Sequence, residues 1–377
     1  MAAAATATNR RVILKEYVEG YPREEHMELL PGAEVPLRLA GDKPPGSVLV
    51  RNLYLSCDPY MRPKMSRPLR ESYTVAFVPG SVITGYGVAR VLDSSDPRLA
   101  PGDLVWGITG WEDYSVVRPP TTAFLAKISH HGGVPLSYYT GILGMPGLNA
   151  YVGFHEICAL KAGEAVFVSA ASGAVGQLVG QFARLAGCRV VGSAGSAEKV
   201  ELLRTRFGFH DAFNYKEEPD LKSALKRSVP LLLIMLALHL NLNDELSPTG
   251  HLGRYFPDGI DIYFENVGGE MLEAALANMN TYGRVAVSGV ISEYTGAGRR
   301  AVPDLLEVIY KRITIRGFFA WDFLPKFAEF NAAIGEWVRQ GKVQVIEDVS
   351  DGLESVPSAF AALFSGQNVG KKLVKLA

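Results

Sequence analysis

One stretch of the chain constrains its fold more than any other, because a short buried strand, a glycine-containing turn and an amphipathic helix follow one another directly. Residues 165–170 (Ala-Val-Phe-Val-Ser-Ala) are a short apolar run, as expected of a strand that is covered on both faces. A helix is predicted over residues 173–186 from the spacing of its apolar side chains, which are Val175, Leu178, Val179, Phe182 and Leu185. This order predicts an α/β fold with a parallel sheet.

The alternation of strand and helix continues through the middle of the chain. The further predicted elements are strands at 189–192, 212–215, 260–265, 284–288 and 314–319, with helices at 197–207 and 220–226. Such a succession predicts a doubly wound parallel sheet with helices on both faces.

The two ends of the chain have a different texture. Near the N-terminus, strand-like runs at 11–14, 47–51 and 82–92 are separated by turn signals, which is typical of a small β-barrel-like domain. Near the C-terminus, a helix over 324–340 and short strands at 343–346 and 372–374 are predicted, and we expect these strands to rejoin the first domain. The expected organisation is residues 1–140, residues 141–320 and a return segment, residues 321–377.

The turn between the first strand and helix has the pattern of a dinucleotide-binding loop. It comprises Ala170, Ala171, Ser172, Gly173, Ala174, Val175 and Gly176, which is A-x-G-x-x-G from Ala171 with alanine in place of the first glycine. Gly173 would let the backbone approach a pyrophosphate, and Gly176 would let the helix pack close to the sheet. The free N–H groups of the helix N-terminus would face the phosphates. The alternative is a tight strand–helix turn with no ligand.

The end of the second strand indicates which dinucleotide binds. NAD-specific folds usually place an acidic residue there, on the ribose 2′-hydroxyl, whereas this chain has Ser193 and no carboxylate between Gly173 and Glu198. Lys199 follows on the first turn of the next helix and could pair with a 2′-phosphate. The sequence therefore favours NADPH over NADH.

Charge and cysteine content exclude several classes of function. With 38 Lys+Arg against 39 Asp+Glu, the net charge of −1 argues against a nucleic-acid-binding protein. The longest apolar run, residues 231–238, is too short to span a bilayer, and the Ala- and Thr-rich first residues do not have the pattern of a secretory signal, so we expect none. Three scattered cysteines, Cys57, Cys158 and Cys188, exclude a disulfide scaffold. We expect a cytoplasmic protein that binds neither nucleic acid nor membrane.

Several motifs resemble one group of the medium-chain dehydrogenase/reductase superfamily, the zinc-independent alkenal and prostaglandin reductases, and most closely the plant NADPH-dependent double-bond (2-alkenal) reductases. The matching segments are residues 55–62, 85–89, 143–151, 170–176, 264–269 and 366–371, so the resemblance covers nearly the whole chain in order. It implies a GroES-like domain built from both chain ends, a Rossmann domain between them, NADPH as cofactor and a homodimer.

The resemblance also implies roles for individual residues. Those expected at the adenosine phosphate are Gly195, Lys199 and Tyr215. Those expected around the ribose and nicotinamide are Asn266, Ser288, Phe318, Phe319, Ala320 and Asn368. Those expected to line the substrate pocket are Tyr60, Tyr86 and Tyr294.

The residues available argue against a zinc site. Cys57 falls where zinc-dependent relatives keep a ligand, but the Gly-His-Glu segment that supplies the next ligand is replaced by residues 84–87 (Thr-Gly-Tyr-Gly). Three scattered cysteines cannot build a four-cysteine structural site, and the seven histidines show no metal-binding spacing. We therefore expect no metal.

Without a metal, hydrogen bonds must polarise the substrate carbonyl. The expected reaction is hydride transfer from NADPH to the β-carbon of an α,β-unsaturated aldehyde or ketone, with charge developing on the oxygen. A tyrosine hydroxyl or the nicotinamide ribose 2′-hydroxyl would stabilise that charge, and tyrosine or water would protonate the α-carbon. Tyr294 is the first candidate for this role, with Tyr60 and Tyr86 as pocket walls. The alternatives are a quinone oxidoreductase of the same superfamily and a catalytically impaired NADPH-binding protein.

One segment departs from the family pattern. Residues 228–254 stand where relatives pass almost directly from the third helix of the Rossmann domain to the fourth strand, and their first half is apolar without helical amphipathicity. Such a long connection is uncommon in a compact domain. It could be an ordered lid or partner-binding element, a tolerated surface loop, or the product of an imperfect gene model, which we favour.

Overall fold

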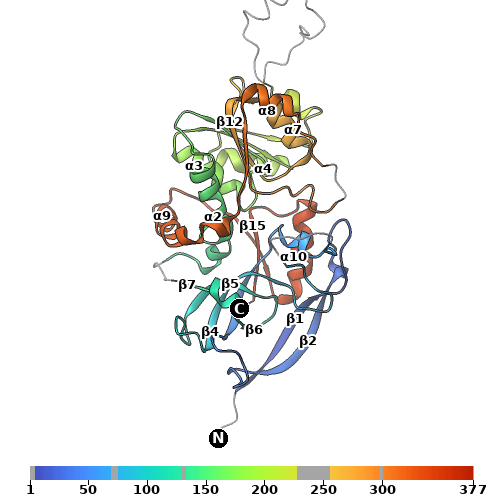
Figure 1. The fold of residues 1–377 in the computed structure, drawn as a ribbon, viewed down its shortest axis with the longest axis vertical. Coiled ribbons are helices and arrows are strands. Elements are labelled where there is room, and N and C mark those ends of the chain that lie inside the picture. The colour runs from blue at the N-terminus through green and yellow to red at the C-terminus, as the bar shows by residue number, and fades with distance from the viewer. Residues whose placement is uncertain (1–4, 69–74, 129–132, 227–254, 297–299, 377) are drawn as a thin grey trace, which may run out of the picture.

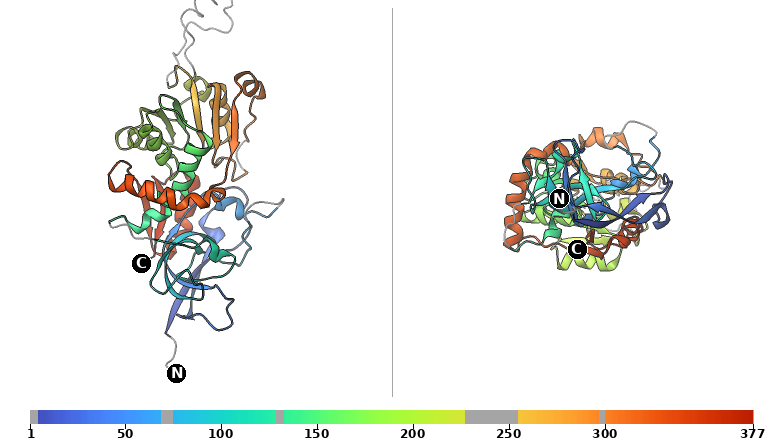
Figure 2. Two further views of the ribbon diagram at one scale, coloured as in Figure 1. Left: turned by 60° about the vertical axis from the view of Figure 1, so that its left-hand side comes forward. Right: turned by 90° about the horizontal axis from the view of Figure 1, so that it is seen from below.

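The computed structural model describes residues 5–68, 75–128, 133–226, 255–296 and 300–376. Two large sheets lie toward opposite ends of an elongated molecule, as Figures 1 and 2 show. The expected insertion at 228–254 lies outside the described residues. Among the helices described, none is both long and apolar enough to cross a membrane.

The first sheet has six strands, and every neighbouring pair in it is parallel. Its order is β10 (Asp211–Asn214), β9 (Arg189–Ala194), β8 (Ala165–Val168), β11 (Ile260–Glu265), β12 (Met279–Val287) and β13 (Thr314–Gly317). The helices between its strands are α3 (Gly176–Leu185), α4 (Ala197–Thr205), α5 (Leu221–Ala224), α7 (Gly269–Ala277) and α8 (Leu305–Lys311). Numbered along the chain, this order is 3-2-1-4-5-6, which is the doubly wound Rossmann arrangement. The predicted fold class is confirmed.

The second sheet is formed by both ends of the chain. Its order is β14 (Glu347–Asp351), β15 (Lys371–Lys375), β3 (Val48–Ser56), β4 (Thr84–Ser94), β5 (Leu104–Gly110) and β7 (Ala126–Lys127), with β6 (Tyr114–Val117) also on β3. All pairs are antiparallel except β14 with β15. β15 pairs with β3 from Leu373 opposite Ser56 to Lys375 opposite Tyr54, so the last strand does join the N-terminal sheet as expected. A separate hairpin consists of β1 (Thr6–Leu14) and β2 (Met27–Pro36).

The predicted helix over 324–340 is shorter in the structure. Its regular part is α9 (Phe327–Arg339), and the preceding segment Ala320–Lys326 is a 3₁₀ turn that contains Pro325. Proline has no N–H to donate and its ring clashes with the preceding turn of an α-helix, so the α-helix begins beyond it.

The predicted strand at 343–346 was wrong, because the strand begins only at Glu347. Two side-chain amides of α3 take the place of a neighbouring strand. Gln177 accepts from Ile346 N (3.0 Å) and donates to Ile346 O (3.2 Å). Gln181 accepts from Gln344 N (2.8 Å) and donates to Gln344 O (2.8 Å). Residues four apart lie on one face of a helix, so the two amides together hold an extended segment.

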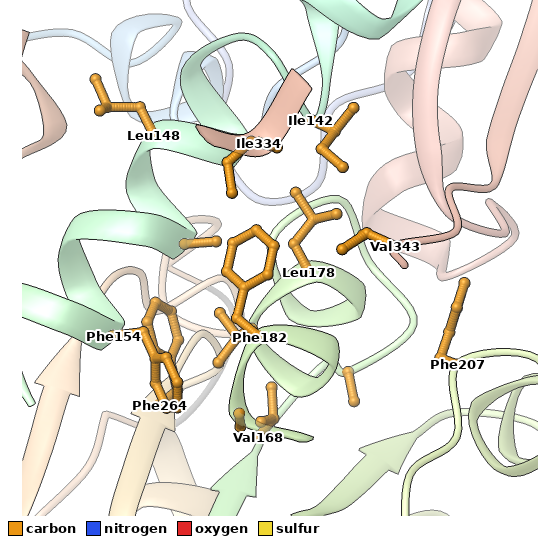
Figure 3. Packing of buried hydrophobic residues seen from close by; sticks show 14 of the residues in the cluster. Ile142, Leu148, Phe154, Val168, Leu178, Phe182, Phe207, Phe264, Ile334 and Val343 are labelled. Carbon is orange, nitrogen blue, oxygen red and sulfur yellow. The ribbon is translucent and has the colours of Figure 1, made fainter. Parts of the chain in front are cut away.

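A shared apolar core lies beneath this contact. Figure 3 shows Phe182 and Leu178 of α3 facing Ile334 of α9 and Val343, with Phe154 and Phe264 close by. Phe154 belongs to a π-helical turn, Gly153–Ile157, that continues from α2 (Met145–Val152). Helix α3 follows the predicted dinucleotide-binding loop, residues 170–176, which is called the cofactor loop below. This helix, α9 and the segment that returns to the antiparallel sheet are therefore packed as one unit.

We predict that Gln177→Met destabilises the protein, because the Ile346 N–H would lose its partner, while the Ile346 carbonyl would keep only its bond from Lys371 N (2.9 Å). Each buried polar group left unpaired costs about 1–3 kcal/mol, and urea unfolding of the variant should show a loss of about that size. Gln340→Met is the control, since Gln340 is exposed and bonds only within its own helix end, to Glu336. Equal stability of the two variants would contradict this account.

Candidate active site

The cofactor loop lies where the strand order reverses. It runs from the end of β8 to the start of α3, beside the end of β11, and this is the position at which doubly wound sheets bind their ligands. A side chain at Gly176 would place its Cβ 2.5 Å from Ala170 O and 2.7 Å from Ala171 Cα, so only glycine fits there. At Gly173 the nearest protein atom would be 3.2 Å away. A side chain is therefore excluded at Gly176 by close backbone contacts, and at Gly173 it would meet a tight contact with Ala170 O.

The expected adenosine phosphate residues are brought together at the ends of β9 and β10. Ser196 caps α4 by accepting from Lys199 N (3.4 Å), which fixes Lys199 on the first turn. A Cβ on Gly195 would lie 3.3 Å from the Tyr215 ring and 3.4 Å from Lys216 Cε. Gly195, Lys199 and Tyr215 thus form a cluster, and Lys216 joins it.

Lys199 is held in a partly buried position. Its Nζ donates to Gly366 O (2.7 Å), and its pKa is lowered first by burial and then by the positive charge of Lys216. Two ammonium groups that repel each other favour a bound anion such as a ribose 2′-phosphate. The sequence analysis missed Lys216, although its position directly after Tyr215 was visible.

The expected nicotinamide-side residues come from several elements: Asn266 follows β11, Ser288 follows β12, residues 318–320 follow β13 and Asn368 precedes β15. Asn266 donates from its side chain to Ser169 O (2.8 Å), and Ser288 accepts from Asn149 Nδ2 (2.7 Å). The Asn368 side chain donates to Gly370 O (3.0 Å). The segment 318–320, called the aromatic strap below, consists of Phe318, Phe319 and the buried Ala320.

Glu265 is a further residue that the sequence analysis did not single out. It is fully buried, and its carboxylate accepts from the backbone N–H groups of Val267 and Gly268. Burial raises its pKa, although those bonds oppose the shift. The carboxylate therefore fixes the turn that carries Asn266.

The tyrosines come from two sides. Tyr60 and Tyr86 meet edge to face with centroids 6.3 Å apart, and Tyr86 stacks on Trp106 at 5.0 Å. Tyr294 belongs to the turn after β12, where its hydroxyl would lie 3.0 Å from a Cβ on Gly289. Thus Tyr60 and Tyr86 belong to the antiparallel sheet's side of the site, and Tyr294 belongs to the Rossmann side.

The surroundings of Cys57 do not fit a metal ligand. Burial raises the pKa of its thiol to about 12, and the Lys371 ammonium donates to Cys57 O (2.9 Å) and to Asp58 Oδ1 (3.0 Å). A ligand thiol must be deprotonated, and a neighbouring ammonium repels a metal cation. Within the described part of the chain, no group of three or more His, Cys, Asp and Glu could hold a metal ion.

Family models match both parts of the chain. Residues 10–125 match an N-terminal domain of oxidoreductase, and residues 174–339 match a zinc-binding dehydrogenase model. The NADP(+)-dependent 2-alkenal reductase of Nicotiana tabacum is 53% identical, over 98% of each chain. The chain belongs to the medium-chain dehydrogenase/reductase superfamily. The predicted resemblance to its alkenal reductases is confirmed.

Two other superfamily members extend this comparison. The (+)-pulegone reductase of Mentha piperita is 45% identical, over 97% of this chain and 98% of its own. The crystal structure of CurA from Vibrio vulnificus in complex with NADPH matches with a TM-score of 0.79 and 32% identity, over 98% of this chain and 99% of that one. The similarity therefore covers both sheets.

We predict that the three thiols resist alkylation in the native protein. Burial raises the pKa of Cys57 and Cys158 to about 12 and that of Cys188 less far. A thiol pKa of about 12 in place of about 9 lowers the thiolate fraction of Cys57 and Cys158 near neutral pH about a thousandfold, and burial of all three side chains adds a steric barrier. Iodoacetamide should label all three thiols only after unfolding.

Val302→Cys provides the positive control for this experiment, because Val302 is 71% exposed. Its thiol should react at the rate of a small-molecule thiol. Rapid labelling of a native cysteine in the parent protein would show that the burial described above is not maintained in solution.

Proposed function

We propose that this protein uses NADPH to reduce the α,β carbon–carbon double bond of enals and enones, by hydride transfer to the β-carbon and without zinc. The observation that carries the proposal is full-length similarity to enzymes named 2-alkenal and (+)-pulegone reductases, combined with a buried ammonium beside Cys57. With an ammonium there, polarisation of the substrate carbonyl falls to hydrogen-bond donors.

We infer that the loop from Ala170 to Gly176 holds the pyrophosphate of NADPH and that Lys199, Lys216 and Tyr215 hold its 2′-phosphate. The paired cations and the glycine geometry support this placement. Asn266, Ser288, Asn368 and the strap 318–320 would bind the ribose and nicotinamide. The NADPH complex of the related CurA supports the choice of cofactor.

The tyrosines would handle the charge that develops on the substrate. When bound, NADPH supplies the hydride for the new C–H bond at the β-carbon. Burial and the nearby Asp58 carboxylate keep the pKa of Tyr86 well above its usual value, so its phenol stays protonated and can donate. In the proposal, Tyr60 and Tyr86 bound the substrate, while Tyr294 stabilises the enolate oxygen or protonates the α-carbon.

We also propose the division into residues 1–140, 141–320 and 321–377. All strands of the parallel sheet fall between residues 165 and 317. The antiparallel sheet takes its strands from residues 48–127 and 347–375, which supports a substrate domain made from both chain ends. A cytoplasmic location remains part of the proposal.

The central test is NADPH oxidation, followed by absorbance, with an alkenal and separately with a quinone. We expect turnover on the alkenal that exceeds turnover on the quinone. The reverse preference would favour a quinone oxidoreductase, and NADPH binding without turnover would favour an impaired variant. The same assay on a chain lacking residues 228–254 tests the insertion: retained activity fits a loop or gene-model origin, and lost activity fits a functional element.

Tyr294→Phe should lower kcat on alkenals by about tenfold or more, because a hydroxyl that acts only in the transition state is removed. NADPH affinity should change little. Tyr282→Phe is the matched control, since Tyr282 is exposed on the strand before the same turn and should have no effect. Unchanged kcat and kcat/KM in Tyr294→Phe would remove Tyr294 from the mechanism.

We propose a homodimer formed through the β13 edge of the parallel sheet. β13 is the last strand in the sheet order, and all four of its residues are exposed. The preceding helix α8 exposes more than half of four apolar side chains, namely Leu305, Leu306, Ile309 and Tyr310. An open edge beside an apolar helix face is suited to pairing with another chain.

Ile309→Asp should shift the protein from a dimer to a monomer of 40.9 kDa, because it places a charge in the proposed interface. Light scattering coupled to gel filtration measures the mass. Val349→Asp is the control, because Val349 is an exposed valine on β14 in the other sheet. A parent protein that is already monomeric would refute the dimer.

A further inference from the structure

A buried ion pair lies between the two sides of the site. Lys371, the first residue of β15, is 1% exposed, and its Nζ donates to Asp58 Oδ1 (3.0 Å) and to Cys57 O (2.9 Å). The second carboxylate oxygen of Asp58 accepts from Ser56 Oγ (2.7 Å), and both of these residues are buried. The pair is thus well supplied with hydrogen bonds.

Stability alone does not explain such a pair. Desolvating two charges costs several kcal/mol per ion, and apolar residues of similar volume often replace a buried pair with no loss of stability. What a buried pair can provide is a fixed geometry between the elements that carry it. The elements connected by this pair therefore indicate its purpose.

One end of the pair leads to the substrate side. Asp58 precedes Pro59 and Tyr60, and its carbonyl accepts from Met61 N (3.1 Å), which closes the turn that carries Tyr60. Tyr60 contacts Tyr86, and the Asp58 charge acts on Tyr86. The turn that begins at Asp58 therefore carries Tyr60, and through the contact of Tyr60 with Tyr86 a shift of this turn would disturb the wall made by both tyrosines.

The other end leads to the cofactor loop. Lys371 follows Gly370, whose N–H donates to Ser172 O (3.1 Å), and Gly370 forms a parallel bridge with Gly173. Gly370 has φ +79°, and a Cβ there would lie 2.2 Å from Ile346 O, so the backbone just before Lys371 requires glycine. The backbone next to Lys371 is therefore attached directly to the predicted pyrophosphate loop.

We propose that Lys371 and Asp58 are positioning residues that fix the distance between the cofactor loop and the tyrosine wall, and so between the hydride donor and the substrate carbonyl. Lys371 also neutralises the Asp58 carboxylate, which would otherwise oppose negative charge growing on the substrate oxygen beside Tyr86. This inference rests on the proposed enal reduction.

The test is the rate constant for hydride transfer in a single turnover, with saturating NADPH and an alkenal, measured by stopped-flow absorbance. Such a rate constant does not depend on the fraction of folded molecules. In Lys371→Met it should fall by about tenfold or more, while the Kd for NADPH changes by less than about threefold. A purely structural role would lower the amplitude and leave the rate constant unchanged.

A double variant separates stability from positioning. Asp58→Asn with Lys371→Met removes both charges, so its Tm should rise above that of Lys371→Met alone, yet its hydride-transfer rate should stay about tenfold below the parent. It also serves if the single variant does not fold. Lys372→Met is the matched control, because Lys372 lies next to Lys371 on β15 and pairs with Asp348 of β14 (2.7 Å), and this variant should transfer hydride at the parent rate.

The outcomes are distinct. If the parent reduces no alkenal, the proposed function fails and this inference falls with it. If the parent reduces the alkenal and both Lys371 variants transfer hydride at its rate, only the inference is overturned. The inference would also be overturned if the double variant recovered both the parent's Tm and its hydride-transfer rate constant. The Lys371–Asp58 ion pair would then be dispensable for positioning.

Discussion

Helix α3 contacts both halves of the candidate site, and the relative placement of the two sheets depends on these contacts. The turn before α3 contacts Gly370, next to β15. The buried face of α3 binds residues 344–346 through the side chains of Gln177 and Gln181. Each side-chain amide bonds to the N–H and C=O of one residue, and Lys371 N also donates to Ile346 O (2.9 Å), so the segment approaching β14 is held by α3 as well as by β15. The helix that would face the phosphates is therefore also the one that fixes the return of the chain to the substrate side.

This arrangement explains which parts of the fold the sequence could predict. The succession of strands and helices along the chain and the loop motif at residues 170–176 follow from local signals: apolar runs of strand length, a glycine turn and helical spacing. The 343–346 segment has the composition of a strand, but its backbone hydrogen-bonds to the side chains of Gln177 and Gln181 instead of pairing as a strand. The pattern of apolar residues in the segment cannot tell these two kinds of partner apart. The error in the 324–340 helix was avoidable, since Pro325 was visible in the sequence.

The site was less predictable than the fold. Motifs placed Lys199, Tyr215 and Tyr86 in the region, but the contribution of each depends on neighbours far away in the sequence. Lys371 lies in a quoted motif, yet its partner Asp58 is 313 residues away, and only the pairing of β15 with β3 brings them together. Charge composition could not reveal this pair, because a net charge of −1 is the same whether two opposite charges are buried together or exposed separately.

The chain matches a zinc-binding dehydrogenase model, yet we propose that it works without zinc. The Lys371–Asp58 ion pair offers a physical reason. A catalytic zinc polarises a carbonyl by placing positive charge near its oxygen. In this chain the Lys371 ammonium donates to Cys57 O, but Asp58 neutralises its charge, so it would offer the substrate oxygen little net charge. Polarisation must then come from neutral donors whose protons are retained, and a buried phenol with a raised pKa, such as Tyr86, is that kind of group. In the proposed mechanism the buried pair and the Tyr86 phenol are thus two parts of one electrostatic arrangement, because hydrogen-bond donors stabilise a growing negative charge best when no unpaired carboxylate lies beside them.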